Sequence, residues 1–237
     1  MATRNLEVFY SGAPALHDVA LNIYGNEVTS LIVPSGCGKS TFIRSLNRMN
    51  DTIENCSVED AVFLDGGDIY GRGLDVAQLR TRIATVFQKP NPFPKFHRIA
   101  KDKEELNGIV LGGLERTDLL DEVRDRLDMS GTSFSRGQQQ RLCIAHSIAV
   151  RPEVILMDES CSALDPIATA RIGELITELK AQYTIVIVTY SMQQARRFSD
   201  KTAYFQLSRI IEHGDTENLF ETAQDERTSD YVMRRIG

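Results

Sequence analysis

The nine residues Val33 to Thr41 read VPSGCGKST, a glycine-rich run that ends in Lys39, Ser40 and Thr41. In such a run the backbone N–H groups curl around phosphate oxygens, the lysine neutralises their charge, and the next hydroxyl reaches a bound Mg²⁺. The full pattern begins with a glycine where this chain has Val33, so only its second half is complete. Taken alone, the fragment fits a nucleoside triphosphate site and a plain Gly/Ser turn before a helix about equally well.

The segments on either side of this run have the order strand, loop, helix that phosphate binding requires. Val28 to Val33 is an apolar, β-branched segment typical of a strand, and a helix is predicted from Ser40 to Asn50. One face of that helix collects the apolar side chains of Phe42, Ile43, Leu46 and Met49. Its N-terminus would point at the phosphates, where the helix dipole favours negative charge.

Apolar runs alternate with helical patterns along the rest of the chain. The predicted strands are Ala61 to Leu64, Ile83 to Phe87, Val154 to Met157 and Thr184 to Thr189, after a short hairpin region over Leu6 to Val19. Helices are predicted within 99–129 and through Ile172 to Leu179. This alternation indicates an α/β domain with a mainly parallel sheet. We expect a single domain over 1–237, with a helical lobe at roughly 95–150.

The composition is that of an ordinary globular protein. The 237 residues are 42% hydrophobic and 25% charged, and the formal charge of −6 gives no support to a nucleic-acid surface. The four cysteines, Cys37, Cys56, Cys143 and Cys161, show no metal-ligand spacing, so we expect thiols in a reducing compartment. No apolar run is long enough for a signal peptide core or a membrane span, which predicts a cytosolic protein.

Asp158 and Glu159 directly follow the apolar run Val154 to Met157. A fully apolar strand is buried on both faces, and ligands bind at the C-terminal ends of such strands. Downstream of a Gly-Lys-Ser loop, an Asp-Glu pair in this position is typical of the half of a hydrolytic site that holds Mg²⁺ and activates water. A solvated Asp-Glu pair at a strand end is the less favoured alternative.

Between these two halves lies FSRGQ, residues Phe134 to Gln138, where the ATP-binding cassette (ABC) superfamily carries LSGGQ. The chain resembles this superfamily from about Asn5 to Gly237, and it looks most like the ATPase subunit of the phosphate-specific ABC importer. That closer resemblance rests on six runs: KPNPFP after Gln88, GQQQRLCIA from Gly137, SALDPIAT from Ser162, YTIVIVT from Tyr183, MQQA from Met192, and RTSDY near the C-terminus.

The resemblance implies an α/β P-loop NTPase of the ABC cassette type, with a mainly parallel central sheet, a small N-terminal antiparallel β region and an inserted helical lobe. It implies ATP and Mg²⁺ as cofactors and an ATPase that drives inorganic phosphate uptake. The implied partners are a second copy of the chain in a head-to-tail homodimer, two integral membrane permease subunits and, indirectly, a periplasmic or extracellular phosphate-binding protein, but no nucleic acid. Such a subunit lies peripherally on the cytoplasmic face of the cell membrane.

The resemblance also implies residue roles. Glu159 would be the general base, Gln88 would contact Mg²⁺ and the attacking water, and Tyr190 stands where the family has its switch-loop histidine. Mg²⁺ would be held by Ser40, Gln88 and Asp158. Nucleotide binding is expected, within one subunit or across the dimer, at Val33, Pro34, Ser35, Gly36, Cys37, Gly38, Lys39, Ser40, Thr41, Ser135, Arg136, Gly137, Gln138 and Asp165. Tyr10 matches the aromatic residue that stacks on adenine, and a core or hairpin tyrosine is a comparable interpretation.

Three departures from the family pattern fall on the chemistry. Val33 either strains the loop backbone, at about 1–3 kcal/mol, or in a β conformation merely extends the strand. Arg136 replaces a signature glycine and either obstructs dimer closure, which we favour, or brings positive charge to the γ-phosphate. Tyr190 cannot reproduce imidazole geometry or charge, and losing one transition-state donor typically lowers the rate about 10²–10³-fold.

Two milder departures are Ser160-Cys161, where Pro-Thr or Pro-Cys is usual, and a shortened segment after Pro94, KFHRIAKDKEEL, which alters the surface expected to face membrane subunits. The leading hypothesis is a working ATPase. The alternative is a regulatory or structural ABC subunit that binds ATP and hardly hydrolyses it. A soluble ABC protein that acts on nucleic acid or ribosomes is disfavoured by the acidic charge balance.

Overall fold

The computed structural model describes residues 1–34, 36–89, 100–159 and 164–236. The strands within these ranges are β1 (Ala2–Tyr10), β2 (Ala13–Asn22), β3 (Val28–Ile32), β4 (Cys56–Leu64), β5 (Gly67–Asp68), β6 (Ile83–Val86), β7 (Val154–Asp158), β8 (Thr184–Thr189), β9 (Lys201–Gln206) and β10 (Arg209–Asp215). They form an antiparallel sheet of order β2-β1-β4-β5 and a larger sheet of order β10-β9-β3-β8-β7-β6. The larger sheet is parallel except at its edge strand β10, which confirms the predicted α/β fold with a mainly parallel sheet.

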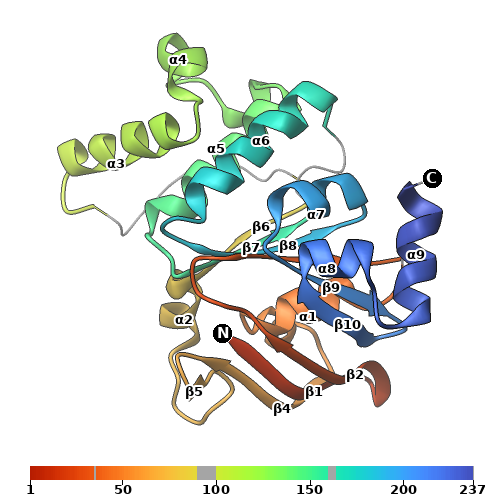
Figure 1. Cartoon of the computed structure of the whole chain (residues 1–237). Helices are drawn as coiled ribbons and strands as arrows, with labels where there is room; N and C mark the ends of the chain where they lie inside the picture. Colours follow the sequence, from red (N-terminus) through yellow and green to blue (C-terminus); the bar gives the residue numbers. More distant parts are fainter. Residues whose placement is uncertain (35, 90–99, 160–163, 237) are drawn as a thin grey trace.

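Helices cover both faces of the larger sheet. The α-helices are α1 (Lys39–Ser45), α2 (Val76–Arg82), α3 (Lys103–Arg116), α4 (Leu120–Val123), α5 (Arg136–Ala149), α6 (Pro166–Leu179), α7 (Met192–Phe198), α8 (Thr216–Glu221) and α9 (Glu226–Ile236), and short 3-10 helices lie at Met49–Thr52, Arg124–Arg126 and Gly131–Ser133. Figure 1 shows α5 and α6 above this sheet, with α1 and the antiparallel sheet below it. None of the helices in the described ranges is long and apolar enough to cross a bilayer.

The two faces of the larger sheet bury different apolar clusters because successive side chains of a strand point to opposite sides. Leu156 and Val188 pack with α1 and the antiparallel sheet. Ile155 and Ile187 pack with α5 and α6. All residues of β3 and β8 are buried, which explains why these strands read as unbroken apolar or β-branched runs.

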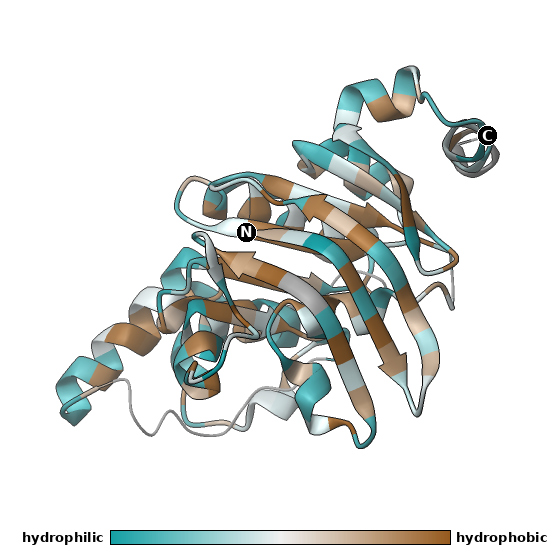
Figure 2. Ribbon diagram, turned by 90° about the horizontal axis from the view of Figure 1, so that it is seen from below, coloured by the Kyte–Doolittle hydropathy of each residue, from teal (hydrophilic) through white to brown (hydrophobic). Residues whose placement is uncertain are grey.

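The predicted N-terminal hairpin is present and is longer than Leu6 to Val19. β1 and β2 pair around the turn Ser11-Gly12, with Tyr10 opposite Ala13. Figure 2 shows apolar and polar residues alternating along the strands of this antiparallel sheet, as expected for a sheet with one face in the core. No cysteine in the described part of the chain forms a disulfide.

The helix after the phosphate loop is shorter than predicted. It ends at Ser45 rather than Asn50, and Met49 begins a 3-10 turn instead of extending the apolar face. The Asn50 side chain donates to the carbonyl of Thr41 at 2.9 Å and to Ser45 Oγ at 2.8 Å, while Arg48 takes a left-handed conformation with φ 60°. Asn50 thus ties the 3-10 turn back to the first half of the helix, and the chain turns away.

Most of the KPNPFP loop, from Pro90 onward, lies outside the described residues. So do Pro94 with the start of the segment after it, Ser35, and the pair Ser160-Cys161.

Candidate functional site

The residues predicted to act on a nucleotide lie at the C-terminal ends of four neighbouring strands. β3 leads into the phosphate loop, β8 ends just before Tyr190, β7 ends at Asp158, and β6 ends shortly before Gln88. These strands are parallel neighbours in the order β3-β8-β7-β6, so their C-terminal ends meet at one edge of the sheet. Open α/β sheets bind ligands at this edge.

Val33 directly follows β3 and lies in the core. Its side chain is 0% exposed and packs in the cluster that contains α1, and its backbone stays outside the left-handed region. The turns of the loop fall instead on Gly36 and Gly38, with φ of 78° and 95°. The left-handed strain considered for Val33 is therefore not observed, although β3 itself ends one residue earlier, at Ile32. With its side chain in the core, Val33 can offer a phosphate only its backbone.

The outer side of the phosphate loop is braced by two other segments. A Cβ at Gly38 would lie 2.9 Å from the carbonyl oxygen of Ala15, so this position needs glycine for space as well as for its positive φ. On another side, the Ser208 N–H donates to the carbonyl of Cys37 at 3.1 Å. Among the described residues, no side chain caps the N-terminus of α1 at Gly38, which leaves the N–H groups there available to an anion.

Lys39, Gln88 and Tyr190 gather around the buried side chain of Glu159, with Gln88 at the exposed edge of the cluster. Lys39 Nζ pairs with the Glu159 carboxylate, whose side chain is 3% exposed. Gln88 Nε2 donates to the other carboxylate oxygen at 2.7 Å, and Lys39 Nζ lies 5.2 Å from the centroid of the Tyr190 ring. Glu159 has φ 49°, a strained conformation for a residue with a side chain, and its N–H is held by the Val188 carbonyl at 3.0 Å.

The charges of this cluster are perturbed by burial and by each other. Burial opposes the charge on Lys39, but hydrogen bonds with Glu159 and Tyr190 outweigh it and raise the Lys39 pKa above its ordinary value. Burial raises the pKa of Asp158, and the nearby Lys39 partly offsets this effect. Groups perturbed in this way cluster at functional sites.

The carboxylate of Asp158 is suited to a cation. Its Oδ1 is buried and has no hydrogen-bond partner among the described residues, and it stands at the end of the strand next to β8. Mg²⁺ is usually bound by one or two carboxylates together with substrate phosphates, because it keeps several waters. The orphaned oxygen therefore fits a Mg²⁺ ion held between Asp158, Ser40 and nucleotide phosphates.

Tyr10 lies beside the start of α1. Its hydroxyl points at Thr41 Oγ1 and Asn50 Oδ1, at 3.2 Å each, and its ring is half-buried. This geometry joins the hairpin to α1, which agrees with the structural interpretation of Tyr10. It also leaves part of the ring next to the phosphate loop.

The signature segment Ser135 to Gln138 forms the start of α5, and its side-chain hydrogen bonds within the described part of the chain do not involve the Lys39 cluster. Ser135 is the N-cap, and its Oγ accepts from the Gln138 N–H at 3.3 Å while Gln138 Oε1 accepts from the Ser135 N–H at 3.1 Å. Arg136 is exposed at the first helical position. A Cβ at Gly137 would lie 2.9 Å from the Ala168 methyl group, so this glycine lets α5 approach the start of α6.

Glu122 organises this region, and sequence reasoning missed it. Its carboxylate accepts from Gln138 Nε2 at 2.9 Å and pairs with Arg141 at 2.8 Å and Arg171 at 2.6 Å. Burial would raise the pKa of Glu122, but these three partners together lower it. No sequence signal identified it, because its partners come from α5 and α6. Asp165, predicted to couple two sites, is the N-cap of α6 and accepts from the Ile167 and Ala168 N–H groups at 3.0 and 2.9 Å.

A family model described as "ABC transporter" matches residues 16–162, which is more than half of the chain. The chain belongs to the ABC transporter family. The match includes the phosphate loop, Gln88, the signature segment and Asp158-Glu159, the same parts that the sequence motifs identify.

Two solved ABC cassettes have the same fold. CbiO1 of Clostridium perfringens, part of the ABC transporter complex CbiONQ, superimposes with a TM-score of 0.79 at 26% identity over 99% of this chain and 96% of its own. The ATP-binding cassette MJ0796, in a dimeric post-hydrolysis state bound to ADP and Pi, gives a TM-score of 0.75 at 26% identity over 91% of this chain and 98% of its own. The chain is thus an ABC cassette with the P-loop NTPase fold, as its sequence predicts.

Proposed function

We propose that this chain is the ATP-binding and ATP-hydrolysing subunit of an ABC importer, and that it energises uptake of inorganic phosphate through separate membrane subunits. The observation that carries the proposal is the convergence of Lys39, Asp158 and Glu159 at one edge of the sheet, with Gln88 hydrogen-bonded to Glu159. Family membership and the ADP-bound relative support ATP as the substrate.

Binding of ATP redirects Lys39. The loop N–H groups receive the phosphates, and Lys39 exchanges the Glu159 carboxylate for the β- and γ-phosphate oxygens. Ser40 and Asp158 would hold Mg²⁺, which when bound would neutralise the negative charge on the phosphate oxygens. ATP is therefore in competition with Glu159 for the same ammonium group.

Hydrolysis follows from the release of Glu159. Once Lys39 has moved to the phosphates, the carboxylate is free to accept a proton from a water aligned with the γ-phosphate. Gln88 keeps the carboxylate oriented through its 2.7 Å hydrogen bond and offers a second contact to that water. Tyr190 supplies at most one hydroxyl donor beside Lys39, so the rate is lower than with a histidine at this position.

The site is completed by a second copy of the chain. Within one chain, the hydrogen bonds of Ser135 and Gln138 run to each other and to Glu122 rather than to the phosphate loop. In a head-to-tail homodimer, Ser135 and the Gly137 N–H would face the γ-phosphate bound by the partner. Arg136 is exposed at the same helix end, and there it would hinder closure.

Membrane subunits are proposed to dock on the helices away from the nucleotide. A groove of about 640 Å³ between α3 and α5 is lined by Gly108, Gly112 and Ala149, small residues that admit a helix closely. Val110 and Leu111 on α3 are 38% and 40% exposed nearby. Two permease subunits bound here would place the cassette dimer on the cytoplasmic face of the membrane, with a solute-binding protein acting from the other side.

The alternative, a cassette that binds ATP and hardly hydrolyses it, is favoured by Arg136 and Tyr190. Val33 no longer supports it, because its backbone is unstrained and its side chain lies in the core. Steady-state hydrolysis by the wild type beside an Arg136→Gly, Tyr190→His double variant separates the two functions. Wild-type turnover that is undetectable while the double variant is active would favour the alternative.

Phosphate as the transported solute rests on sequence runs such as KPNPFP and SALDPIAT. We expect the chain to restore uptake of radiolabelled phosphate in a bacterial strain that lacks the ATPase subunit of its phosphate importer, and Lys39→Ala not to restore it. Purified chain that hydrolyses ATP while uptake stays at background would remove the phosphate assignment and leave the ATPase intact.

A further inference from the structure

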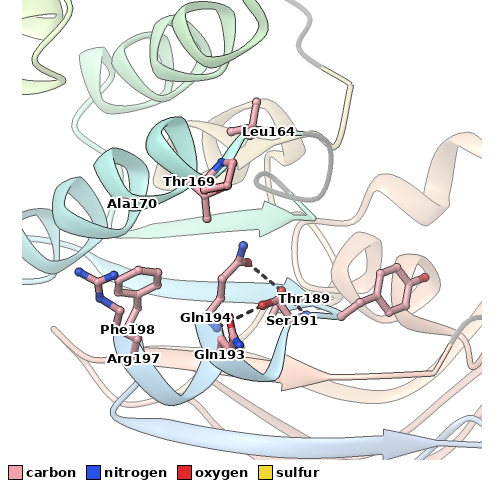
Figure 3. Close-up of a pocket in the computed structure, with 11 residues that line it drawn as sticks. Leu164, Thr169, Ala170, Thr189, Ser191, Gln193, Gln194, Arg197 and Phe198 are labelled. Atoms are coloured by element: carbon pink, nitrogen blue, oxygen red, sulfur yellow. Dashed lines mark hydrogen bonds between the residues drawn. The ribbon is translucent and has the colours of Figure 1, made fainter. Parts of the chain in front are cut away.

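A pocket of about 560 Å³ lies between α6 and α7, and we call it the α6–α7 pocket. Its volume falls in the range of small-molecule sites. Figure 3 shows its walls: Leu164 and Ala170 on one side, Thr189 and Gln194 at the strand end, and Arg197 with Phe198 at the far end. None of the described residues that line it is acidic.

One wall of the pocket presents an oriented amide donor. The Thr189 hydroxyl accepts from the Ser191 N–H at 3.0 Å, so its own proton goes to Gln194 Oε1, also at 3.0 Å. The Gln194 N–H in turn donates to Ser191 Oγ at 3.3 Å. These bonds fix which end of the Gln194 amide is nitrogen, and Figure 3 shows that nitrogen reaching toward Thr169 and Ala170. No described residue accepts a hydrogen bond from it.

The far end of the pocket presents a guanidinium group without a counter-ion. The exposed side chain of Arg197 makes no hydrogen bond or ion pair within the described part of the chain, and its guanidinium carbon lies 5.2 Å from the centre of the Phe198 ring. The adjacent Arg196, in contrast, pairs with Glu221 at 2.9 Å. A positive group and an amide donor on walls without carboxylates favour an anionic ligand.

The apolar wall of the pocket is held rigidly. A Cβ at Gly173 would lie 1.8 Å from the Phe198 ring, so the ring packs directly on the backbone of α6. A glycine inside a helix is less favourable than alanine by about 1 kcal/mol. In α6 this less favourable residue stands at Gly173, where the Phe198 ring leaves no room for a side chain. The Phe198 ring is therefore fixed as a flat surface beside Leu164 and Ala170.

The geometry points to a binding site for a small amphipathic organic anion in the α6–α7 pocket. An aromatic ring or short aliphatic chain lies on Phe198 and Ala170, and a carboxylate or similar group accepts from Arg197 and from Gln194 Nε2. The pocket adjoins the ATP site, because Tyr190 lines it and also lies beside Lys39. Of the described residues, neither Lys39 nor Glu159 lines it, and the proposal does not depend on the proposed transport function.

The test uses 1-anilinonaphthalene-8-sulfonate, an aromatic sulfonate, with its fluorescence titrated against full-length protein in saturating Mg-ATP. We expect Arg197→Gln to weaken binding about 10-fold, and Arg196→Gln, its matched control, to leave affinity unchanged. The neutral probe N-phenyl-1-naphthylamine should bind wild type and Arg197→Gln equally. The Ala170→Trp variant fills the pocket and should abolish binding of both probes. If circular dichroism shows that this variant does not fold, the Thr169→Trp variant is used in its place.

Three outcomes would overturn the proposal. The first is equal affinity of the sulfonate for the Arg197→Gln and Arg196→Gln variants. The second is wild-type affinity in a folded pocket-filling variant. The third is a probe signal that is seen without nucleotide and lost in saturating Mg-ATP, which would place the probe in the nucleotide site.

Discussion

Lys39 and Glu159 form an ion pair between the phosphate loop and the end of β7, and the Glu159 side chain is 3% exposed. Gln88 holds the second carboxylate oxygen at 2.7 Å, so both oxygens are engaged. The lysine proposed to meet ATP and the carboxylate proposed to activate water therefore neutralise each other before nucleotide binds. Under the proposed function, this relationship would couple ATP binding to the release of Glu159 as general base.

Replacing Glu159 by glutamine should strengthen ATP binding. The Glu159→Gln variant removes the charge that competes for Lys39, and a buried cation without its partner gains more from a phosphate. We expect an affinity for ATP about 10-fold higher, measured by equilibrium binding. Glu153→Gln is the matched control, because Glu153 pairs with Arg82 at 2.6 Å on the surface. An ATP affinity of Glu159→Gln equal to that of the control would show that the ion pair does not compete with ATP.

Tyr190→His should accelerate hydrolysis. The imidazole restores a donor with the geometry and charge that the phenol lacks, and one such donor is worth about 10²–10³ in rate. Tyr190→Phe keeps the ring near Lys39 but removes the hydroxyl, and it should be no faster than wild type. Steady-state phosphate release from the three proteins measures the effect, and equal rates for Tyr190→His and wild type would remove Tyr190 as the cause of slow turnover.

Gly173→Ala should destabilise the fold. The new methyl group would overlap the Phe198 ring, where the Cβ position lies 1.8 Å from a ring atom, so the ring must leave its place at a cost of about 1–3 kcal/mol. Gly108→Ala in α3 is the control, since nothing lies within 4 Å of its Cβ position. There alanine should stabilise by roughly 0.5–1 kcal/mol. Urea unfolding compares them, and similar midpoints would contradict the packing of Phe198 on α6.

Burial lowers the pKa of His146 to about 4. The unfolded chain takes up a proton here near the ordinary pKa of about 6.5, whereas the folded chain does so only near 4. Between these values the unfolded state binds more protons, so stability falls as pH falls through this window. His146→Gln should flatten that fall. The effect is measured by the urea midpoints of both proteins at a pH above 6.5 and at a pH between 4 and 6.5. If both proteins lost the same stability on acidification, the argument from the burial of His146 would be contradicted.

The sequence predicted the strands that carry the site because they are buried on both faces. Val154 to Met157 and Thr184 to Thr189 lie in the interior of a parallel sheet, where burial alone dictates an unbroken apolar or β-branched run. The end of α1 was predicted wrongly because apolar spacing continues to Met49. A periodicity argument cannot detect the side chain of Asn50, which holds the following turn against the helix through two hydrogen bonds.

The contacts between distant segments could not be predicted from the sequence. Motifs placed Lys39 and Glu159 in one site, but their ion pair depends on how β3 and β7 flank β8. The Glu122 network depends on the approach of α5 to α6 at Gly137. For Val33 both backbone conformations were open, and only the packed core decides between them.

The most direct measurement is inorganic phosphate release from Mg-ATP by the wild type beside Glu159→Gln, with ATP binding followed on the same samples. The account predicts that both proteins bind ATP and that the variant releases phosphate at least about 10²-fold more slowly, because it has lost the general base. Equal release rates, or a wild type that does not bind Mg-ATP, would contradict it.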